Sequence, residues 1–259
     1  MLGAIIGDFA GSPFEGGGPV PGDFPLLSRR SRFTDDSLLT IVVADCLMEH
    51  RDLVPAFHNI VERYPAAGWG GNFLRWAKAR NTQPFGSYGN GSAMRVSPVG
   101  FMFESAEHTL REAERSAAVT HDHPEGIKGA QATALAIFLA RHGADKQEVQ
   151  RQISTRFGYD LARPLADIRP RFGFDESCQG TVPPAIRAFL ESTDFESALR
   201  NAISLGGDTD TLAAITGPIA QAHYGPVPDT MREWVRWRLP FDLWAVVERF
   251  EERYLPKRA

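Results

Sequence analysis

Hydrophobic residues recur at helical spacing along most of this chain. In residues 35–50, for example, apolar residues occur at 38, 39, 42, 43, 46 and 47, which share one helix face. Comparable patterns predict helices over 35–50, 52–64, 105–120, 125–143, 146–158, 181–192, 194–205, 208–225, 229–239 and 241–255. Alternating strand patterns are nearly absent. The sequence therefore predicts a compact all-α fold, with residues 1–259 forming a single domain.

Prolines and glycines mark the edges of these helices. Pro183 and Pro184 are expected just inside the start of the helix at 181–192, where proline is tolerated. Pro218 falls inside the helix at 208–225 and is expected to kink it. Between the helices, residues 11–33 and 67–100 are rich in glycine, proline, serine and asparagine. Long loops of this kind predict functional segments.

Composition narrows the class of protein. The 259 residues are 43% hydrophobic and carry a net charge of −4, and no Lys- or Arg-rich patch is present, so nucleic acid is an unexpected partner. Two cysteines do not make a disulfide framework and fit a reducing compartment. Acidic residues come too early for a signal peptide, and no run reaches the roughly 20 apolar residues of a membrane helix. We expect a monomeric, cytoplasmic protein that does not engage a membrane.

Two predicted helices begin with more acid than a helix start needs. Residues 34–37 read TDDS, and residues 206–211 read GGDTDT. One Asp or Thr at a helix start is ordinary capping, worth about 1 kcal/mol. Both clusters offer only hard oxygen donors, which suit Mg²⁺, Mn²⁺ or Ca²⁺, and cations would offset the repulsion if the two helix starts converge. From the spacing alone, double capping and a metal site both remain open.

Five stretches, taken in order, resemble the ADP-ribosylglycohydrolase family, of the dinitrogenase reductase-activating glycohydrolase and ADP-ribosylhydrolase type. They are GAIIGDFAGSPFE (3–15), FTDDS (33–37), SYGNGSAMRVSPVG (87–100), THDHPEGIKGA (120–130) and SLGGDTDTLAAITGPIAQAHYG (204–225). The resemblance implies a helical fold that holds a binuclear metal centre, with Mg²⁺ expected first and Mn²⁺ as the other choice.

The resemblance also implies roles for individual residues. The expected ligands of the two divalent cations are Thr34, Asp35, Asp36, Asp208, Asp210 and Thr211. The expected catalytic carboxylates are Glu15, which lies beside the metals in the serine-directed branch of the family, and Asp35. The expected contacts to ADP-ribose are Ser87, Tyr88, Gly89, Asn90, Gly91 and His121.

Simpler interpretations of several side chains stay open. Tyr88 and Phe85 either stack on adenine or pack within their loop. His121 and His123 form an HDH pattern, but we disfavour metal ligation by histidine because the acidic clusters already fill a metal site. Asp8 is interpreted as a structural hydrogen-bonding residue, not as a ligand.

The predicted activity is metal-dependent hydrolysis of the glycosidic bond at the anomeric carbon of ADP-ribose, which would release ADP-ribose from a protein arginine or serine or from a small conjugate. Such cleavage builds oxocarbenium character, metals would hold the ribose and a water, and Glu15 would act as a base or stabilise charge. Two alternatives remain. One is an inactive ADP-ribose-binding or crystallin-like structural member, and the presence of all six metal positions argues against it. The other is a two-metal nucleotide phosphoesterase, against which only the loop motifs argue.

Overall fold

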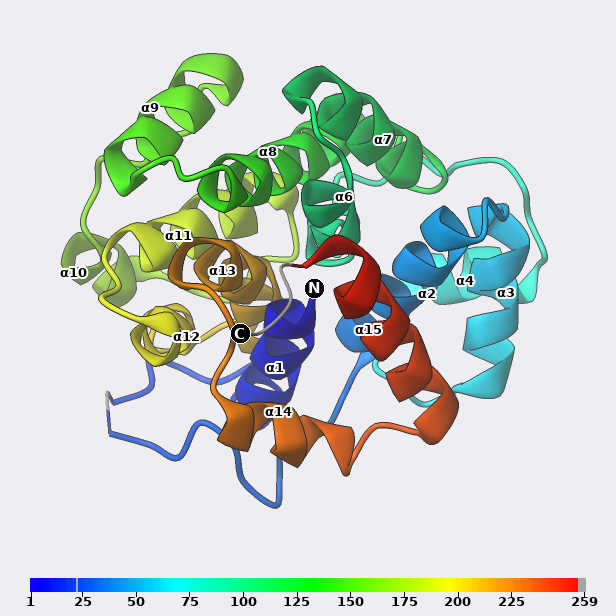
Figure 1. The fold of residues 1–259 in the computed structure, drawn as a ribbon, viewed down its shortest axis with the longest axis horizontal. Coiled ribbons are helices and arrows are strands. Elements are labelled where there is room, and N and C mark those ends of the chain that lie inside the picture. Colours follow the sequence, from blue (N-terminus) through cyan, green and yellow to red (C-terminus); the bar gives the residue numbers. More distant parts are fainter. Residues whose placement is uncertain (22, 256–259) are drawn as a thin grey trace.

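The computed structural model describes residues 1–21 and 23–255, and this part of the chain is built from helices (Figure 1). It contains fifteen α-helices and one short 3₁₀ helix, and it has two isolated bridges, Gly17–Gly207 and Gly89–Ser177, in place of β-strands. The all-α prediction is confirmed. In the same described residues, no helix is both long enough and apolar enough to cross a membrane.

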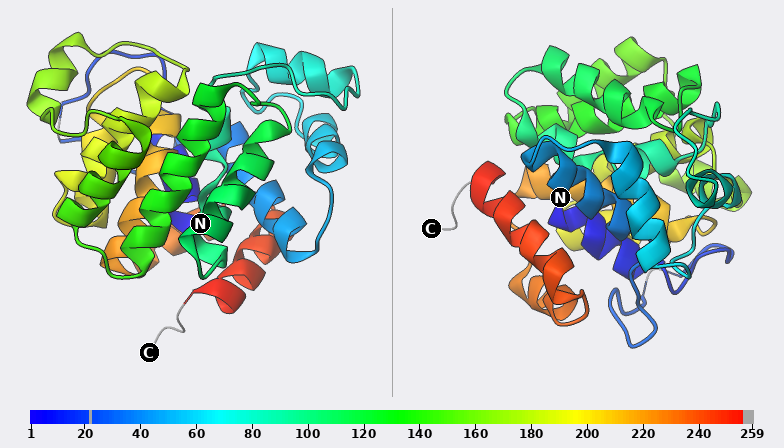
Figure 2. Two further views of the ribbon diagram at one scale, coloured as in Figure 1. Left: turned by 90° about the horizontal axis from the view of Figure 1, so that it is seen from above. Right: turned by 90° about the vertical axis from the view of Figure 1, so that its right-hand side faces the viewer.

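Helices α1 (Leu2–Gly11) and α13 (Thr209–Tyr224) lie side by side at the centre of the molecule (Figures 1 and 2). Gly3, Gly7 and Gly11 recur every four residues and so share the face of α1 that meets α13. A side chain on Gly7 would collide with the Ala213 carbonyl group, so the two helices touch backbone to backbone. This close approach brings the end of α1 against the acidic start of α13.

Gly7→Ala is expected to destabilise the protein by about 1–3 kcal/mol, because the added methyl group meets rigid helix backbone. Urea unfolding followed by circular dichroism measures the change. Gly18→Ala is the matched control, since a Cβ at Gly18 meets no atom within 4 Å, and we expect it to stay within about 0.5 kcal/mol of the parent. Equal stability of the two variants would contradict the close-packed α1–α13 pair.

The remaining helices surround this pair. On one side, α8, α11 and α12 pack against α13, and α7 and α9 cover α8. On the other side, α2 packs on α1, α3 and α15 pack on α2, and α4 packs on α3 (Figure 1). The bounds are α2 Asp35–Met48, α3 Leu53–Arg63, α4 Gly71–Lys78, α5 Gly91–Met94, α6 Ser97–Met102, α7 Ala106–Ala118, α8 Pro124–Arg141, α9 Lys146–Phe157, α10 Leu165–Ile168, the 3₁₀ helix Arg169–Arg171, α11 Cys178–Leu190, α12 Phe195–Ile203, α14 Asp229–Arg236 and α15 Phe241–Tyr254.

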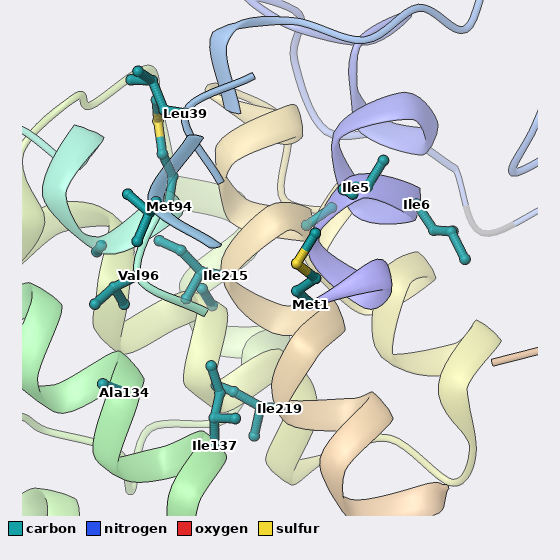
Figure 3. Close-up of a cluster of buried hydrophobic side chains, with 14 of the residues drawn as sticks. Met1, Ile5, Ile6, Leu39, Met94, Val96, Ala134, Ile137, Ile215 and Ile219 are labelled. Carbon is teal, nitrogen blue, oxygen red and sulfur yellow. The ribbon is translucent and has the colours of Figure 1, made fainter. Parts of the chain in front are cut away.

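One continuous apolar core joins these helices. Figure 3 shows Ile215 and Ile219 of α13 pointing toward Val96 and toward Ile137 of α8. All four side chains are fully buried. Because α13 is buried along most of its length, packing holds its N-terminal end in place, and that end carries Asp208 at the cap position and Asp210 in the first turn.

Ten predicted helices are present, but the sequence missed several others. The glycine-rich N-terminus, for which no helix was predicted, forms α1, and Asp8 lies within it. The predicted loop at 67–100 contains α4, α5 and the start of α6. Glycine lowers helix propensity, yet a Cβ on Gly100 would lie 2.6 Å from the Ile137 Cβ, so close packing on α8 explains its presence in α6.

The predicted start of α11 was also wrong. The helix begins at Cys178, where the Ser177 side chain accepts a hydrogen bond from the Gly180 amide. Pro183 and Pro184 therefore lie inside the helix and not at its start. Helix α13 continues as one element through Pro218.

Candidate functional site

The two acidic helix starts converge at the centre of the fold. Asp8 of α1, Asp36 of α2 and Asp210 of α13 each offer a carboxylate oxygen, and these three atoms lie within 4.8 Å of one another. The Thr211 hydroxyl donates to Asp36 Oδ2 over 3.4 Å, which links the first turns of α2 and α13 directly. The sequence separates these two turns by about 170 residues, and the α1–α13 contact brings them together.

Capping does not account for the surplus acid. Helix α2 is capped by Thr34, whose Oγ1 accepts from the Asp36 amide over 3.2 Å. Asp208 sits at the N-cap position of α13, yet its side chain makes no capping bond. Its Oδ2 instead accepts from Asn90 Nδ2 over 2.6 Å. The carboxylates of Asp35 and Asp208 therefore do not cap their helices, which disagrees with the double-capping interpretation of the two acidic clusters.

Asp8 supports the start of α2. Its carboxylate accepts from the Thr34 amide over 2.9 Å, from Thr34 Oγ1 over 2.9 Å, and from the amide and hydroxyl of Ser37. These bonds agree with the hydrogen-bonding role expected from the sequence. Burial raises the pKa of Asp8 to about 6, and the hydrogen bonds from Ser37 and Thr34 oppose that rise.

The cluster is short of positive charge. Burial raises the pKa values of Asp35, Asp36 and Asp210 well above the usual range, and neighbouring carboxylates raise them further. Asp36 Oδ1 is buried and has no hydrogen-bond partner within the described chain. Crowded hard-oxygen donors with an orphaned carboxylate oxygen fit a divalent cation such as Mg²⁺.

A glycine turn places Glu15 beside this cluster. Gly206 and Gly207 have φ values of +77° and +71°, which favour glycine. The Gly207 amide donates to the Gly17 carbonyl over 2.9 Å, so the segment that follows α1 is tied to the start of α13. The Glu15 side chain is 40% exposed and lies 3.8 Å from Arg32. Partial burial and then Asp208 raise the pKa of Glu15, whereas Arg32 lowers it.

A cavity of about 650 Å³ opens above the acids. This volume lies in the range of small-molecule sites. The predicted site residues that line it are Glu15, Asp35, Asp36, Ser87, Tyr88, Gly89, Asn90, Gly91, His121, Asp208, Asp210 and Thr211. Thr34 does not line the cavity; it is buried behind the acids in contact with Asp8. The fold thus joins the acidic clusters and the 87–91 segment in one site.

The 87–91 segment is fixed from two sides. The Asn90 amide donates to the Glu176 carbonyl over 2.7 Å. Its side-chain Nδ2 donates to Asp208 and, over 3.1 Å, to Thr181 Oγ1. Asn90 therefore ties this segment to the acidic cluster. Tyr88 is 52% exposed, so its ring is available to a ligand.

Sequence reasoning missed one wall of the cavity. Phe174, Asp175 and Glu176 line it directly before α11, and Phe174 is 53% exposed. The polar run Phe-Asp-Glu-Ser directly before α11 could have indicated a functional loop. It was missed because the start of α11 was predicted three residues too late, at 181 and not at Cys178. Arg95 lines the cavity as well, and a lone cation in an apolar stretch was its only mark in the sequence.

Comparison with known proteins extends the likeness to the whole chain. A model of the ADP-ribosylglycohydrolase family matches residues 1–258. ADP-ribosylhydrolase ARH3 of Mus musculus is 28% identical over 316 residues, which cover 90% of this chain and 85% of that protein. ADP-ribosylarginine hydrolase Tri1 of Pseudomonas putida is 26% identical over 294 residues, covering 91% and 72%. A solved structure of an ADP-ribosylglycohydrolase-related protein complex superposes with a TM-score of 0.72 at 25% identity, covering 98% of this chain and 96% of that chain.

Proposed function

The chain belongs to the ADP-ribosylglycohydrolase family, and from this premise we propose that it hydrolyses the bond between the anomeric carbon of ADP-ribose and a modified acceptor. The acceptor would be a protein arginine or serine, or a small conjugate. One observation carries the proposal: a single cavity joins the converged acids to the 87–91 segment. A nucleotide-sized ligand held at that segment would extend toward the carboxylates.

The acidic residues of the site would have two roles, as ligands of the metal ions and as the general base. Two divalent cations, Mg²⁺ or Mn²⁺, would be held by Thr34, Asp35, Asp36, Asp208, Asp210 and Thr211. When bound, such ions polarise oxygen atoms and orient hydroxyl groups. Thr34 is hydrogen-bonded to Asp8, and Asp208 is hydrogen-bonded to Asn90. These bonds orient the two side chains before a metal ion or substrate binds. Asp35, only partly buried and on the cavity wall, would also stabilise positive charge that develops on the ribose.

Glu15 would act as the general base. It lies on the cavity wall, and its raised pKa brings it toward the working range of a proton acceptor. Its carboxylate would take a proton from the water that attacks the anomeric carbon as the glycosidic bond breaks, and would return that proton to the departing acceptor atom. Tyr88, half exposed beside Ser87 and Gly89, would contact the base of the nucleotide. Asn90 would hold the 87–91 segment in register with the acids.

Product analysis tests this function. We expect free ADP-ribose from ADP-ribosyl-arginine or ADP-ribosyl-serine when Mg²⁺ is present, and none after chelation with EDTA. Chromatography identifies the product. AMP release from ADP-ribose would instead indicate a phosphoesterase. Tight binding of ADP-ribose without any product from either conjugate would indicate a binding protein. The proposal includes a single-domain, monomeric and cytoplasmic enzyme, for which size-exclusion chromatography and cell fractionation are the measurements.

A further inference from the structure

Arg95 is a buried cation on the cavity wall, and it lacks an acidic partner in the described chain. Its side chain is fully buried, and no carboxylate in that part of the structure lies within ion-pair distance. Nη2 donates to the Ser116 carbonyl over 2.9 Å and to Thr120 Oγ1 over 3.0 Å, whereas Nε and Nη1 have no partner. The guanidinium also lies 4.8 Å from the centre of the Phe57 ring. Burying a guanidinium with two unpartnered nitrogens and no acidic partner costs free energy. We therefore looked for a role in the hydrogen bond that Arg95 makes to Thr120.

The bond from Arg95 fixes the direction of the next hydrogen bond. A guanidinium only donates, so Thr120 Oγ1 accepts from Arg95 and keeps its own hydrogen to give away. Its other partner is His121 Nδ1, at 2.7 Å. If Nδ1 carried a hydrogen, the Thr120 hydrogen would be buried without an acceptor. Thr120 therefore donates to Nδ1, and Nδ1 is the unprotonated nitrogen of the ring.

This order leaves the ring hydrogen of His121 on Nε2. A neutral imidazole that accepts at one nitrogen donates at the other. Burial, and then the charge of Arg95, hold the pKa of His121 well below its usual range, so the ring is neutral.

Nε2 faces the nucleotide side of the cavity. A Cβ on Gly91 would lie 3.1 Å from Nε2, and one on Gly89 would lie 3.6 Å from it. His121 lines the cavity, and within the described residues no protein group is hydrogen-bonded to Nε2. The ring therefore presents an oriented and unused N–H group to whatever occupies the 87–91 segment.

We propose that Arg95 and Thr120 are positioning residues that hold His121 as the neutral Nε2–H tautomer, so that this N–H donates to an acceptor oxygen of the ADP-ribose moiety. The identity of the ligand rests on the proposed function; the tautomer does not. Neither Arg95 nor Thr120 needs to touch the substrate. Thr120 acts on His121 through a direct hydrogen bond, and Arg95 acts on His121 through its hydrogen bond to Thr120.

The tautomer can be measured in the protein without any substitution. Long-range ¹H–¹⁵N spectra of ¹⁵N-histidine-labelled protein with Mg²⁺ distinguish protonated from unprotonated ring nitrogens, and the spectrum of His121→Gln assigns the His121 signals among the 7 histidines. We expect protonated Nε2 and unprotonated Nδ1. Protonated Nδ1 in the wild-type protein would overturn the proposal whatever the variants do.

Two matched substitutions test the chain of hydrogen bonds. Thr120→Val keeps the shape but removes the hydroxyl, so we expect the Nδ1–H form to appear and the Kd of free ADP-ribose to rise about tenfold in calorimetry. Thr120→Ser keeps the hydroxyl and should restore both the tautomer and the Kd. A folded Thr120→Val protein with the wild-type tautomer, or with the wild-type Kd, contradicts the proposal.

Arg95→Met tests the first bond in the chain. Without that donor, Thr120 is free to turn its hydrogen away, and we expect a mixture of tautomers at His121. A folded Arg95→Met protein with pure Nε2–H would remove Arg95 from the proposal. These readouts need no turnover. A protein that binds ADP-ribose with Nε2–H in place but releases no ADP-ribose from its conjugates would contradict the proposed function alone.

Discussion

Glu15→Ala is expected to lower kcat by about 10²–10⁴-fold, the usual contribution of a general base, while the fold and the Mg²⁺ affinity persist. Glu15 lies in a segment after α1, where its substitution leaves the helices intact. Its carboxylate faces the cavity and is close enough to Asp208 for that charge to raise its pKa. Initial rates of ADP-ribose release under saturating conjugate measure the loss, and calorimetric titration with Mg²⁺ measures metal affinity.

Glu62→Ala is a matched control for this substitution. Glu62 is also an exposed glutamate paired with an arginine, lying 2.6 Å from Arg80, but it is on α3 and away from the cavity. We expect it to leave turnover unchanged. Near-normal turnover in Glu15→Ala would contradict the assignment, and an equal loss in both variants would indicate a general effect of removing an ion pair.

Arg32→Gln gives a second view of the same carboxylate. Arg32 lowers the pKa of Glu15, so its removal raises that pKa. A base works in its ionised form, which means that activity is lost as the pH falls through its pKa. The acidic limb of the pH profile of kcat/KM should therefore move to higher pH in Arg32→Gln. A shift to lower pH would assign that limb to another group.

The sequence predicted the helices in which hydrophobic residues recur at helical spacing. It missed α1, because Gly3, Gly7 and Gly11 lower local helix propensity. Those glycines serve a partner helix about 200 residues away, which no local pattern reveals. The same limit applies to the site. Each acidic cluster was visible in the sequence, but their convergence depends on the α1–α13 contact.

Other parts of the site depend on tertiary contacts alone. The wall at 174–176 was lost because the start of α11 was misplaced, and that start is set by the Ser177 side chain. The hydrogen-bond chain from Arg95 through Thr120 joins residues 25 apart in the sequence. A family resemblance marked His121 as a ligand contact, but only the geometry shows which nitrogen carries its hydrogen.

Asp35→Asn is expected to weaken Mg²⁺ binding by at least about 10–100-fold, the range for outer partners of a metal site, and to lower turnover with it. Asp35 begins α2, yet the capping bond is made by Thr34 and not by the Asp35 carboxylate. Asparagine keeps the shape and loses only the charge. Circular dichroism should therefore show unchanged helix content, while calorimetry with Mg²⁺ shows the loss of affinity.

The two interpretations of Asp35 predict opposite signs for stability. Burial and the charge of Asp8 raise the pKa of Asp35, so its ionised form is unfavourable in the metal-free protein. Removing that charge should hold or raise the metal-free Tm while reducing the rise in Tm that Mg²⁺ produces. A true cap behaves differently. Asp52 accepts from the Val54 amide over 2.9 Å at the start of α3.

Asp52→Ala should therefore lower stability by about 1 kcal/mol with or without Mg²⁺. If Asp35→Asn instead lowered the metal-free Tm and left the Mg²⁺ response intact, Asp35 would be a structural acid. The metal site would then have to be built from Asp36, Asp208 and Asp210 without it. Comparing the Tm of Asp35→Asn and of Asp52→Ala, each with and without Mg²⁺, thus separates a metal ligand from a capping residue. The sequence alone does not separate them, because Asp35 and Asp52 both lie at the start of a helix.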